Sequence, residues 1–252
     1  MPFEHNEGIR NEFEIAAYLN GRKLKDMNPH MRKIMKLIFK DAGENSIFES
    51  EKIEGSQKPD IYVKCENETH FISIKSDSTC QVHQEKIDFF VKFLKENNIP
   101  NDIIETICYY QWSDGTLDGS GTKRMDYYQT TSWLKERINR ANTYLNADKS
   151  FIRKFMYRVL FKGSFESNNP AEYVYQGTCE HGVIVSKDEV MIYVNCKHFR
   201  HLSTLHVGPI TIGPHARYSG VDVKREISRQ KVDFRWATIH ADMLYISERY
   251  RS

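Results

Sequence analysis

The sequence lacks a long apolar run, and no stretch approaches the roughly 18 consecutive apolar residues that a membrane-spanning helix needs. Its first residues, MPFEH, contain no basic segment followed by an apolar core, which is the pattern of a secretory signal. The five cysteines are an odd number scattered over 252 residues, unlike a secreted disulfide framework. These absences predict a cytoplasmic protein with reduced thiols and no membrane partner.

Several common site motifs are also missing. The loop 113–121 (SDGTLDGSG) has Thr116 at the third calcium-loop position and Met125 where the closing glutamate belongs. Lys123 follows glycines but does not stand in a phosphate-binding G-x-x-x-x-G-K-[ST] frame. No serine elbow, Cys–His nucleophile pair or dinucleotide-binding glycine motif is present. The sequence therefore excludes these chemistries as its main activity.

Charge is nearly balanced overall, at a net +2, but it is unevenly distributed along the chain. Residues 122–163 carry ten lysines and arginines against three acids, and a second basic stretch over 217–235 is interleaved with aromatic residues. This pattern favours a polyanionic partner, whereas a solvated helix face and a charged hairpin would give the same composition. The interpretation as a nucleic-acid surface predicts these DNA contacts: Lys123, Arg124, Arg153, Arg217, Lys224, Arg225, Arg229, Lys231 and Arg235.

Hydrophobic periodicity predicts an α/β fold with a central mixed β-sheet, helices on both sides and a β-rich C-terminal region. Helices are expected over 7–19, 29–42, 79–96 including Val82, 133–145 and 150–161. Strands are expected over 61–63, 72–75, 171–175, 183–186, 190–194 and 209–212, with a turn at Lys187–Asp188. No linker is sharp enough to divide the chain. We therefore expect a single domain over 1–252, with a catalytic half, 1–110, and a basic half, 111–252.

The most informative stretch is a predicted hairpin from residue 59 to residue 75. Asp60 begins one apolar run, Ile61-Tyr62-Val63, and Lys75 ends a second, Ile72-Ser73-Ile74-Lys75. Because side chains alternate along a strand, Ser73 and Lys75 share a polar face while their isoleucine neighbours point into a core. An acid and a lysine brought together in this way can hold a divalent metal beside a phosphodiester.

Such a site ordinarily has a second acid two residues before the lysine, and here that residue is Ser73. A neutral hydroxyl is a weak metal ligand, so another carboxylate has to supply the missing charge. The candidates are Glu12 and Glu14 on the first predicted helix and Glu85 beyond the lysine strand.

Pro59-Asp60 and, after twelve intervening residues, Ser73-Ile74-Lys75, preceded by a helix with Glu12 and Glu14, resemble the PD-(D/E)xK nuclease superfamily, specifically type II restriction endonucleases. The resemblance implies a restriction-endonuclease-like fold and Mg²⁺-dependent cleavage of double-stranded DNA that leaves 5′-phosphates. It also implies restriction of foreign DNA as the biology, with a cognate DNA methyltransferase as partner.

Carried onto this chain, the resemblance makes Asp60 the metal ligand, Lys75 the catalytic lysine and Ser73 a degenerate middle position. Glu12 or Glu14 becomes the helix acid. From their positions in the sequence, Glu14 and Glu85 are the further candidate metal ligands beside Asp60. The alternative is a non-catalytic DNA-binding protein on a degenerate scaffold. An RNA-processing nuclease is a third possibility, and both a monomer and a homodimer stay open.

A second constellation consists of two Cys-x-His pairs: Cys179 with His181, and Cys196 with His198. A hairpin turning at Lys187–Asp188 would place the two thiols opposite each other, within reach of one structural zinc ion. The Cys-x-His spacing is unusual for zinc, and such residues at strand ends more often pack and form hydrogen bonds. Packing is therefore the favoured interpretation, with zinc as its alternative.

Overall fold

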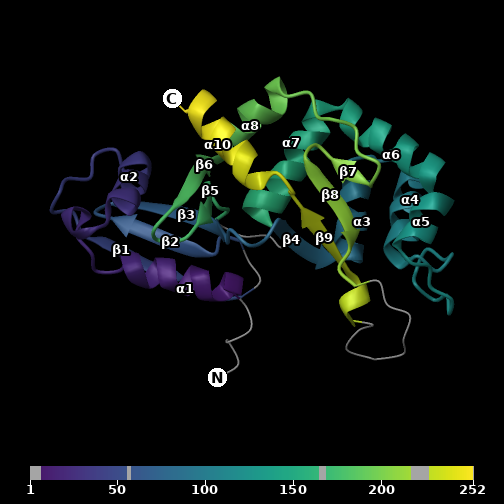
Figure 1. Ribbon diagram of the computed structural model, residues 1–252, viewed down its shortest axis with the longest axis horizontal. Helices are drawn as coiled ribbons and strands as arrows, with labels where there is room; N and C mark the ends of the chain where they lie inside the picture. Colours follow the sequence, from purple (N-terminus) through teal and green to yellow (C-terminus); the bar gives the residue numbers. More distant parts are fainter. Residues whose placement is uncertain (1–6, 56–57, 165–168, 217–226, 252) are drawn as a thin grey trace. The chain divides into compact units, whose positions relative to one another are not determined.

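The computed structural model describes residues 7–55, 58–164, 169–216 and 227–251, which form two compact units interleaved along the chain (Figure 1). Unit 1 comprises Met1–Cys80, Met156–Asn195 and Thr238–Ser252, and unit 2 comprises Gln81–Phe155 and Cys196–Ala237. These units do not coincide with the expected halves 1–110 and 111–252, because the chain leaves unit 1 after Cys80 and returns at Met156. Among the described residues, no helix is both long and apolar enough to cross a membrane.

The expected α/β class is confirmed, with a mixed sheet in unit 1 and an antiparallel sheet in unit 2. The sheet of unit 1 has the strand order β1-β2-β3-β5-β6, and its only parallel pair among the described strands is β3–β5. These strands are β1 (Phe48–Lys52), β2 (Ile61–Cys65), β3 (Glu68–Lys75), β5 (Tyr173–Gly177) and β6 (Gly182–Ser186).

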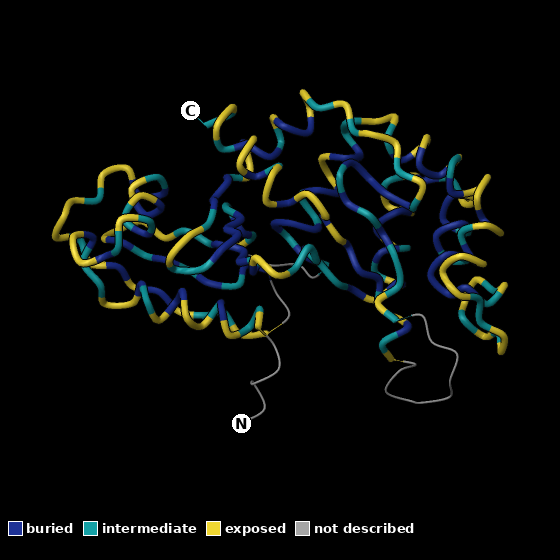
Figure 2. The backbone as a smooth tube through the Cα atoms, in the orientation of Figure 1, coloured by how far each residue is buried: buried dark blue, intermediate teal, exposed yellow. Residues whose placement is uncertain are grey.

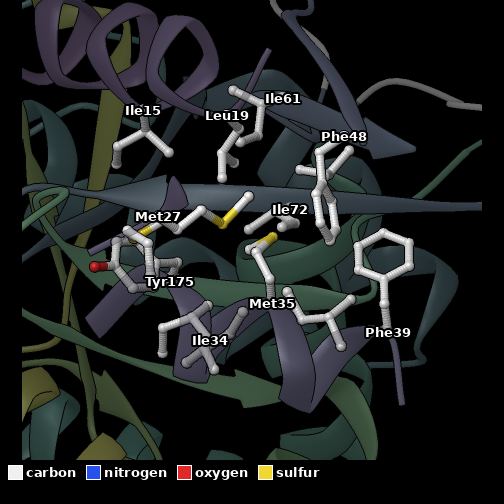
Figure 3. Packing of buried hydrophobic residues seen from close by; sticks show 14 of the residues in the cluster. Ile15, Leu19, Met27, Ile34, Met35, Phe39, Phe48, Ile61, Ile72 and Tyr175 are labelled. Atoms are coloured by element: carbon white, nitrogen blue, oxygen red, sulfur yellow. The ribbon is translucent and has the colours of Figure 1, made fainter. Parts of the chain in front are cut away.

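The predicted hairpin is present as β2 and β3, in the register Ile61↔Ile72 to Cys65↔Glu68. Ile61, Val63, Ile72 and Ile74 are buried on one face, as the alternation predicts. They pack in a core cluster with residues from α1 (Glu7–Leu19) and α2 (Pro29–Ile38), which Figure 3 shows from close by. Burying each of these side chains contributes about 1.5–3 kcal/mol relative to exposure.

Both N-terminal helices begin and face the core for reasons that are visible in the sequence. Buried and exposed residues alternate at helical spacing along α1 (Figure 2). At the start of α2, the Asn28 side chain accepts a hydrogen bond of 2.7 Å from the Met31 amide, and Pro29 occupies the first helical position. A short 3₁₀ turn, Leu24–Asp26, separates the two helices.

The predicted strand 190–194 is wrong, because these residues belong to helix α8 (Lys187–Cys196). The helix begins with a reciprocal cap: Glu189 Oε2 accepts from the Ser186 amide at 2.6 Å, and Ser186 Oγ accepts from the Glu189 amide at 3.2 Å. The sequence S-K-D-E therefore starts a helix where a turn at Lys187–Asp188 was expected. The Tyr193 hydroxyl in α8 donates to Asp242 of helix α10 (Ile239–Arg249) at 2.8 Å.

Unit 2 contains a four-stranded antiparallel sheet in the order β4-β9-β8-β7. Its strands are β4 (Gln81–Lys86), β7 (His206–Val207), β8 (Ile210–Pro214) and β9 (Lys231–Arg235). The helix expected over 79–96 is wrong in its first part, since Val82 lies on β4 and the helix α3 begins at Ile87 (Ile87–Glu96). Residues 81–86 carry few of the apolar residues that define a helical stripe, and they pair with β9 instead.

The helices of unit 2 surround an aromatic core. They are α3, α4 (Asn101–Trp112), α5 (Tyr127–Trp133), α6 (Lys135–Ala147) and the part of α7 (Lys149–Tyr157) up to Phe155, while the π-helical turn Arg158–Lys162 belongs to unit 1. The ring centroids of Phe90 and Phe155 lie 5.0 and 5.5 Å from that of Phe234 on β9. Edge-to-face contacts of this kind stabilise a core beyond the area that they bury.

Replacing Ser186 with alanine tests the cap of α8. We expect Ser186→Ala to lower the free energy of unfolding by about 1 kcal/mol, because the Glu189 amide loses its acceptor. Urea unfolding followed by circular dichroism measures this change. Ser247→Ala inside α10 is the control, since alanine favours a helix interior; an equal loss in both variants would contradict the capping role.

Candidate active site

Asp60 and Lys75 meet at the end of the β2–β3 hairpin, as predicted. Lys75 Nζ donates to Asp60 Oδ2 at 3.2 Å, and the Ile74 amide donates to the same oxygen at 2.6 Å. The third donor is Ser73 Oγ at 2.9 Å, so three consecutive residues of β3 hold one carboxylate oxygen. Lys75 Nζ also donates to the Ile74 carbonyl at 2.7 Å. Both charged side chains are largely buried, with exposures of 17% for Asp60 and 10% for Lys75.

Ser73 therefore lies on the face that carries Asp60 and Lys75. It is fully buried, and its hydroxyl is already donated to Asp60. In this arrangement the serine orients the acid at the end of the hairpin. Its own oxygen adds no negative charge for a cation.

The ionisation of Asp60 reflects a balance between burial and positive charge. Burial alone would raise the pKa of Asp60, but the charges of Lys75 and Lys58 and the hydrogen bonds from Ile74 and Ser73 lower it below its ordinary value of 3.8. Lys58 is buried, and its ammonium donates to the Val159 carbonyl. Asp60 is consequently a carboxylate at neutral pH.

Glu12 is the helix acid that the structure brings toward this pair. Its carboxylate forms an ion pair with Lys52 on β1, and its side chain is 14% exposed. Burial and the negative charge of Asp60 raise the pKa of Glu12, while Lys52 and Lys75 oppose that shift. One turn of α1 is fixed here because Asn11 Nδ2 donates to the Gly177 carbonyl at the end of β5, at 2.8 Å.

Glu14 and Glu85 lie in other surroundings. Glu14 is 61% exposed, forms an ion pair with Arg10 at 3.4 Å and helps to line a cavity of about 340 Å³ beside the Ser76–Ser78 segment. Glu85 belongs to β4 of unit 2, where its buried carboxylate lies 3.7 Å from His83 Nε2. Of the candidate acids, Glu12 is the one on which the negative charge of Asp60 is seen to act.

The alternative zinc site loses its geometric basis. Cys179 lies in unit 1 and Cys196 is assigned to unit 2, and helix α8 replaces the hairpin that was expected to bring them together. Burial raises the pKa of Cys179 to about 11, which disfavours the thiolate that zinc requires. His181 forms an ion pair with Asp77 at 2.6 Å, and His198 is exposed. The described part of the chain contains no group of three or more His, Cys, Asp or Glu residues arranged for a metal.

The predicted DNA contacts divide into buried and exposed side chains. Arg229 is 2% exposed, with its guanidinium over the Trp112 ring at 5.3 Å, which argues against a phosphate contact. Arg124 forms an ion pair with buried Asp114 at 3.1 Å. Arg235 is half exposed and pairs with Asp233 at 2.8 Å. Lys123 and Arg153 are exposed and Lys231 is partly so, whereas Arg217, Lys224 and Arg225 lie outside the described residues.

Two lysines of the site were missed by sequence analysis. Lys52 pairs with Ile61 in the β1–β2 register, which places it at the strand end beside Glu12. Lys58 is two residues from Asp60, and its charge lowers the pKa of that acid. The available signals were the alternation Phe48-Ser50-Lys52 along β1 and the proximity of Lys58 to Asp60 in sequence.

The assembled site has two buried carboxylates, Glu12 and Asp60, and three lysines, Lys52, Lys58 and Lys75, in electrostatic contact with them. Such a set can bind a cation through its acids and a phosphate through its lysines. Comparison with known protein families finds no match for the chain, and comparison with curated proteins finds no significant similarity. These two comparisons therefore assign no role to the residues of the site.

Removing the lysine tests the electrostatic balance at Asp60. We expect Lys75→Met to raise the pKa of Asp60, because burial then acts against less positive charge. In the wild type, the lowered pKa stabilises the fold above about pH 4 and this contribution is lost as the pH falls through the folded-state value. The pKa can be measured by carbon NMR of the aspartate carboxyl groups.

In the same variant, the free energy of unfolding at pH 7 should fall by about 1–3 kcal/mol. The difference from the wild type should shrink as the pH falls through the raised pKa of Asp60, since a neutral acid needs no counter-charge. Lys64→Met, at an exposed ion pair on β2, is the control. A pH-independent difference would contradict the pairing.

Proposed function

We propose that the chain is a Mg²⁺-dependent endonuclease that cleaves double-stranded DNA, with restriction of foreign DNA as its biology. The observation that carries this proposal is the convergence of Asp60, Lys75 and Glu12 at one end of the mixed sheet. The sequence resemblance to the PD-(D/E)xK nuclease superfamily supports the same assignment. The geometry and the resemblance rest on the same residues, because the segment between Asp60 and Lys75 forms the β2–β3 hairpin that brings these two side chains into contact.

The donor set fits magnesium. Asp60 is ionised, and all three of its side-chain hydrogen bonds go to Oδ2, so Oδ1 has no partner within the described ranges. Glu12 adds a second carboxylate, and magnesium is commonly held by one or two carboxylates together with water and substrate phosphate. When bound, Mg²⁺ would polarise the scissile phosphate and acidify a coordinated water.

Lys75 would act on the substrate side of the site. Its ammonium is fixed by Asp60 and by the Ile74 carbonyl, so it needs little rearrangement to orient the attacking water. With two carboxylates and three lysines, the site carries a formal charge of +1, counted from the contacts with Lys52, Lys58 and Lys75. This surplus suits a phosphodiester, which brings one negative charge.

Duplex DNA would be held by basic side chains that are exposed, such as Lys123, Arg153 and Arg235. Lysines and arginines of this kind position the phosphate backbone and make affinity salt-dependent. The recognition sequence, the cut pattern and a methyltransferase partner follow from the resemblance alone.

Cleavage of plasmid DNA is the direct test. We expect wild-type protein to cut in the presence of Mg²⁺, and Asp60→Asn and Lys75→Met each to reduce the rate by about 100-fold or more, because each removes charge aimed at the reacting phosphate. Glu12→Gln should also reduce the rate, whereas Glu14→Gln should leave it nearly unchanged. Gel assays over a range of Mg²⁺ concentrations measure these rates, and the sequenced ends of the products should carry 5′-phosphates.

A non-catalytic DNA-binding protein is the second candidate, favoured by the buried position of Ser73 and its bond to Asp60. In that case, duplex DNA would bind with a strong salt dependence, no cleavage would occur with any divalent metal, and the Asp60 and Lys75 variants would bind normally. Cleavage of structured RNA with duplex DNA left intact would identify the substrate as RNA.

Restoring an acid at Ser73 tests its relation to the metal. Ser73 Oγ lies 2.9 Å from Asp60 Oδ2, so a carboxylate there adds charge within ligand reach. We expect Ser73→Asp to lower the Mg²⁺ dissociation constant by about tenfold, measured by calorimetry, and to destabilise the metal-free fold because two acids then repel. Ser73→Asn has similar size without the charge. Equal affinities in both variants would mean that residue 73 does not face the metal.

A further inference from the structure

The antiparallel sheet of unit 2, in which β4, β9 and β8 lie side by side, has a core face and a polar face (Figure 1). Phe234 on β9 points into the aromatic core. Because side chains alternate along a strand, its neighbours Asp233 and Arg235 belong to the opposite, polar face. The residues paired with these two on β4 and β8 share that face: Gln84, Gly213 and Thr211.

Asp233 is a buried acid that collects hydrogen bonds on this polar face. It is 1% exposed, and its Oδ1 accepts from Gln84 Nε2 at 2.9 Å while its Oδ2 accepts from Arg235 Nη2 at 2.8 Å. The Nδ1 atom of His215 lies 3.1 Å from both oxygens. A buried carboxylate is costly unless it is paired and hydrogen-bonded, so Asp233 fixes the side chains around it.

The guanidinium group of Arg235 stays accessible although Asp233 holds it. The side chain is 51% exposed, and it lines a cavity of about 240 Å³ together with Thr211, Tyr110 and Tyr127. A guanidinium group has five N–H donors, and within the described ranges Asp233 takes one of them. The remaining donors are available to a ligand, on a side chain that is already oriented.

The charges of the polar face favour duplex DNA. Lys86 on β4 is paired with Lys231 on β9, and neither forms an ion pair within the described part of the chain. Like charges opposite each other destabilise a sheet, and an anionic backbone would relieve this repulsion. Arg235, by contrast, is compensated by Asp233. A compensated arginine suits the neutral acceptors of a base edge, whereas uncompensated lysines suit phosphates.

The spacing of these residues matches the major groove of DNA. Lys231 and Arg235 are four residues apart on β9, which is about 13 Å at the ordinary rise of an antiparallel strand. The major groove is about 12 Å wide and admits a two-stranded ribbon such as β8–β9. A ribbon with Arg235 over the base edges therefore places Lys231 and Lys86 near the phosphates that border the groove.

From this arrangement, we propose that the polar face of β8 and β9 reads DNA sequence in the major groove, with Arg235 contacting one guanine. Two N–H groups of Arg235 donate to O6 and N7 of the base, the acceptor pair that marks guanine in this groove. Asp233 is a positioning residue, because it holds the guanidinium group without touching the base. The inference rests on the proposed function, which supplies duplex DNA as the substrate, and adds a residue that determines specificity.

The first part of the closing experiment identifies the guanine. Full-length wild-type protein, without divalent metal so that no strand is cut, selects duplexes from a library of random sequence. We expect the sequenced duplexes to have guanine fixed at one or more positions. Replacing this guanine with 7-deazaguanine removes the N7 acceptor and keeps the pairing with cytosine. At the position that Arg235 reads, this change should weaken wild-type binding by about tenfold.

The second part assigns the contact to Arg235. Arg235→Lys keeps the charge and loses the planar fork. We expect it to bind random duplexes nearly as tightly as the wild type, to bind the selected duplex about 10–100-fold more weakly, and to ignore the 7-deazaguanine replacement. Asp233→Asn should reduce sensitivity to 7-deazaguanine in the same way, a ratio that lost stability alone would not change. Arg140→Lys is the matched control, since Arg140 on α6 is exposed and pairs with Asp102 at 2.9 Å; it should keep the wild-type preference.

The outcomes separate this inference from the proposed function. A selection without a preferred sequence, or a guanine preference that Arg235→Lys retains, overturns the inference. Equal loss of affinity for all duplexes in Arg235→Lys also overturns it and makes Arg235 a phosphate contact. These results leave the nuclease assignment to the plasmid assay. Selective binding through Arg235 by a protein that cleaves no nucleic acid supports the inference and overturns the nuclease assignment, whereas no binding to duplex DNA with or without Mg²⁺ overturns both.

Discussion

The attachment of one carboxylate oxygen to three consecutive residues of β3 is the interaction on which the candidate site depends. Asp60 precedes β2, and its Oδ2 accepts from Ser73, Ile74 and Lys75. The backbone supports the same contact, because the Asp60 amide donates to the Ile72 carbonyl at 3.0 Å and the Asp60 carbonyl accepts from Ile53 at 2.8 Å. The acid is thus oriented by the hairpin itself, through three donors that all use the same carboxylate oxygen.

Charge compensation explains why so many lysines surround two acids. Burying a carboxylate without a partner is expensive, and both Glu12 and Asp60 are largely removed from water. Lys52 compensates Glu12, while Lys58 and Lys75 compensate Asp60, so each acid has a cation close by. A cation entering the site would compete with these lysines for the carboxylates, whereas a phosphate would bind to them. A metal and a phosphate entering together would therefore disturb the balance least.

Much of this arrangement could be predicted from local pattern, because a hairpin of alternating residues places Asp60, Ser73 and Lys75 on one face wherever it folds. The choice between Glu12 and Glu14 depended on helix phase: Glu12 precedes buried Ile15 and Ala16 by three and four positions and shares their side of α1. The prediction of a strand over 190–194 was wrong because a short run of β-branched and aromatic residues fits a strand or a helix. The cap formed by Ser186 and Glu189 at the start of α8 decides for the helix. The pairing of Lys75 with Gln176 could not be predicted, because β3 and β5 are about a hundred residues apart in the sequence and no local pattern shows that they pair.

Ser73 is better understood through this sheet than as a lost acid. A carboxylate at its position would lie against Asp60, inside a face already compensated by two lysines, and would need a tightly bound cation to be tolerated. With serine, the two acids Glu12 and Asp60 are compensated within the fold by Lys52, Lys58 and Lys75. The parallel pairing of β3 with β5 places Gln176 next to Lys75, on the side of β3 away from β2. The polar residues Asp60, Lys75 and Gln176 therefore follow one another across the sheet, from the start of β2 over β3 to β5.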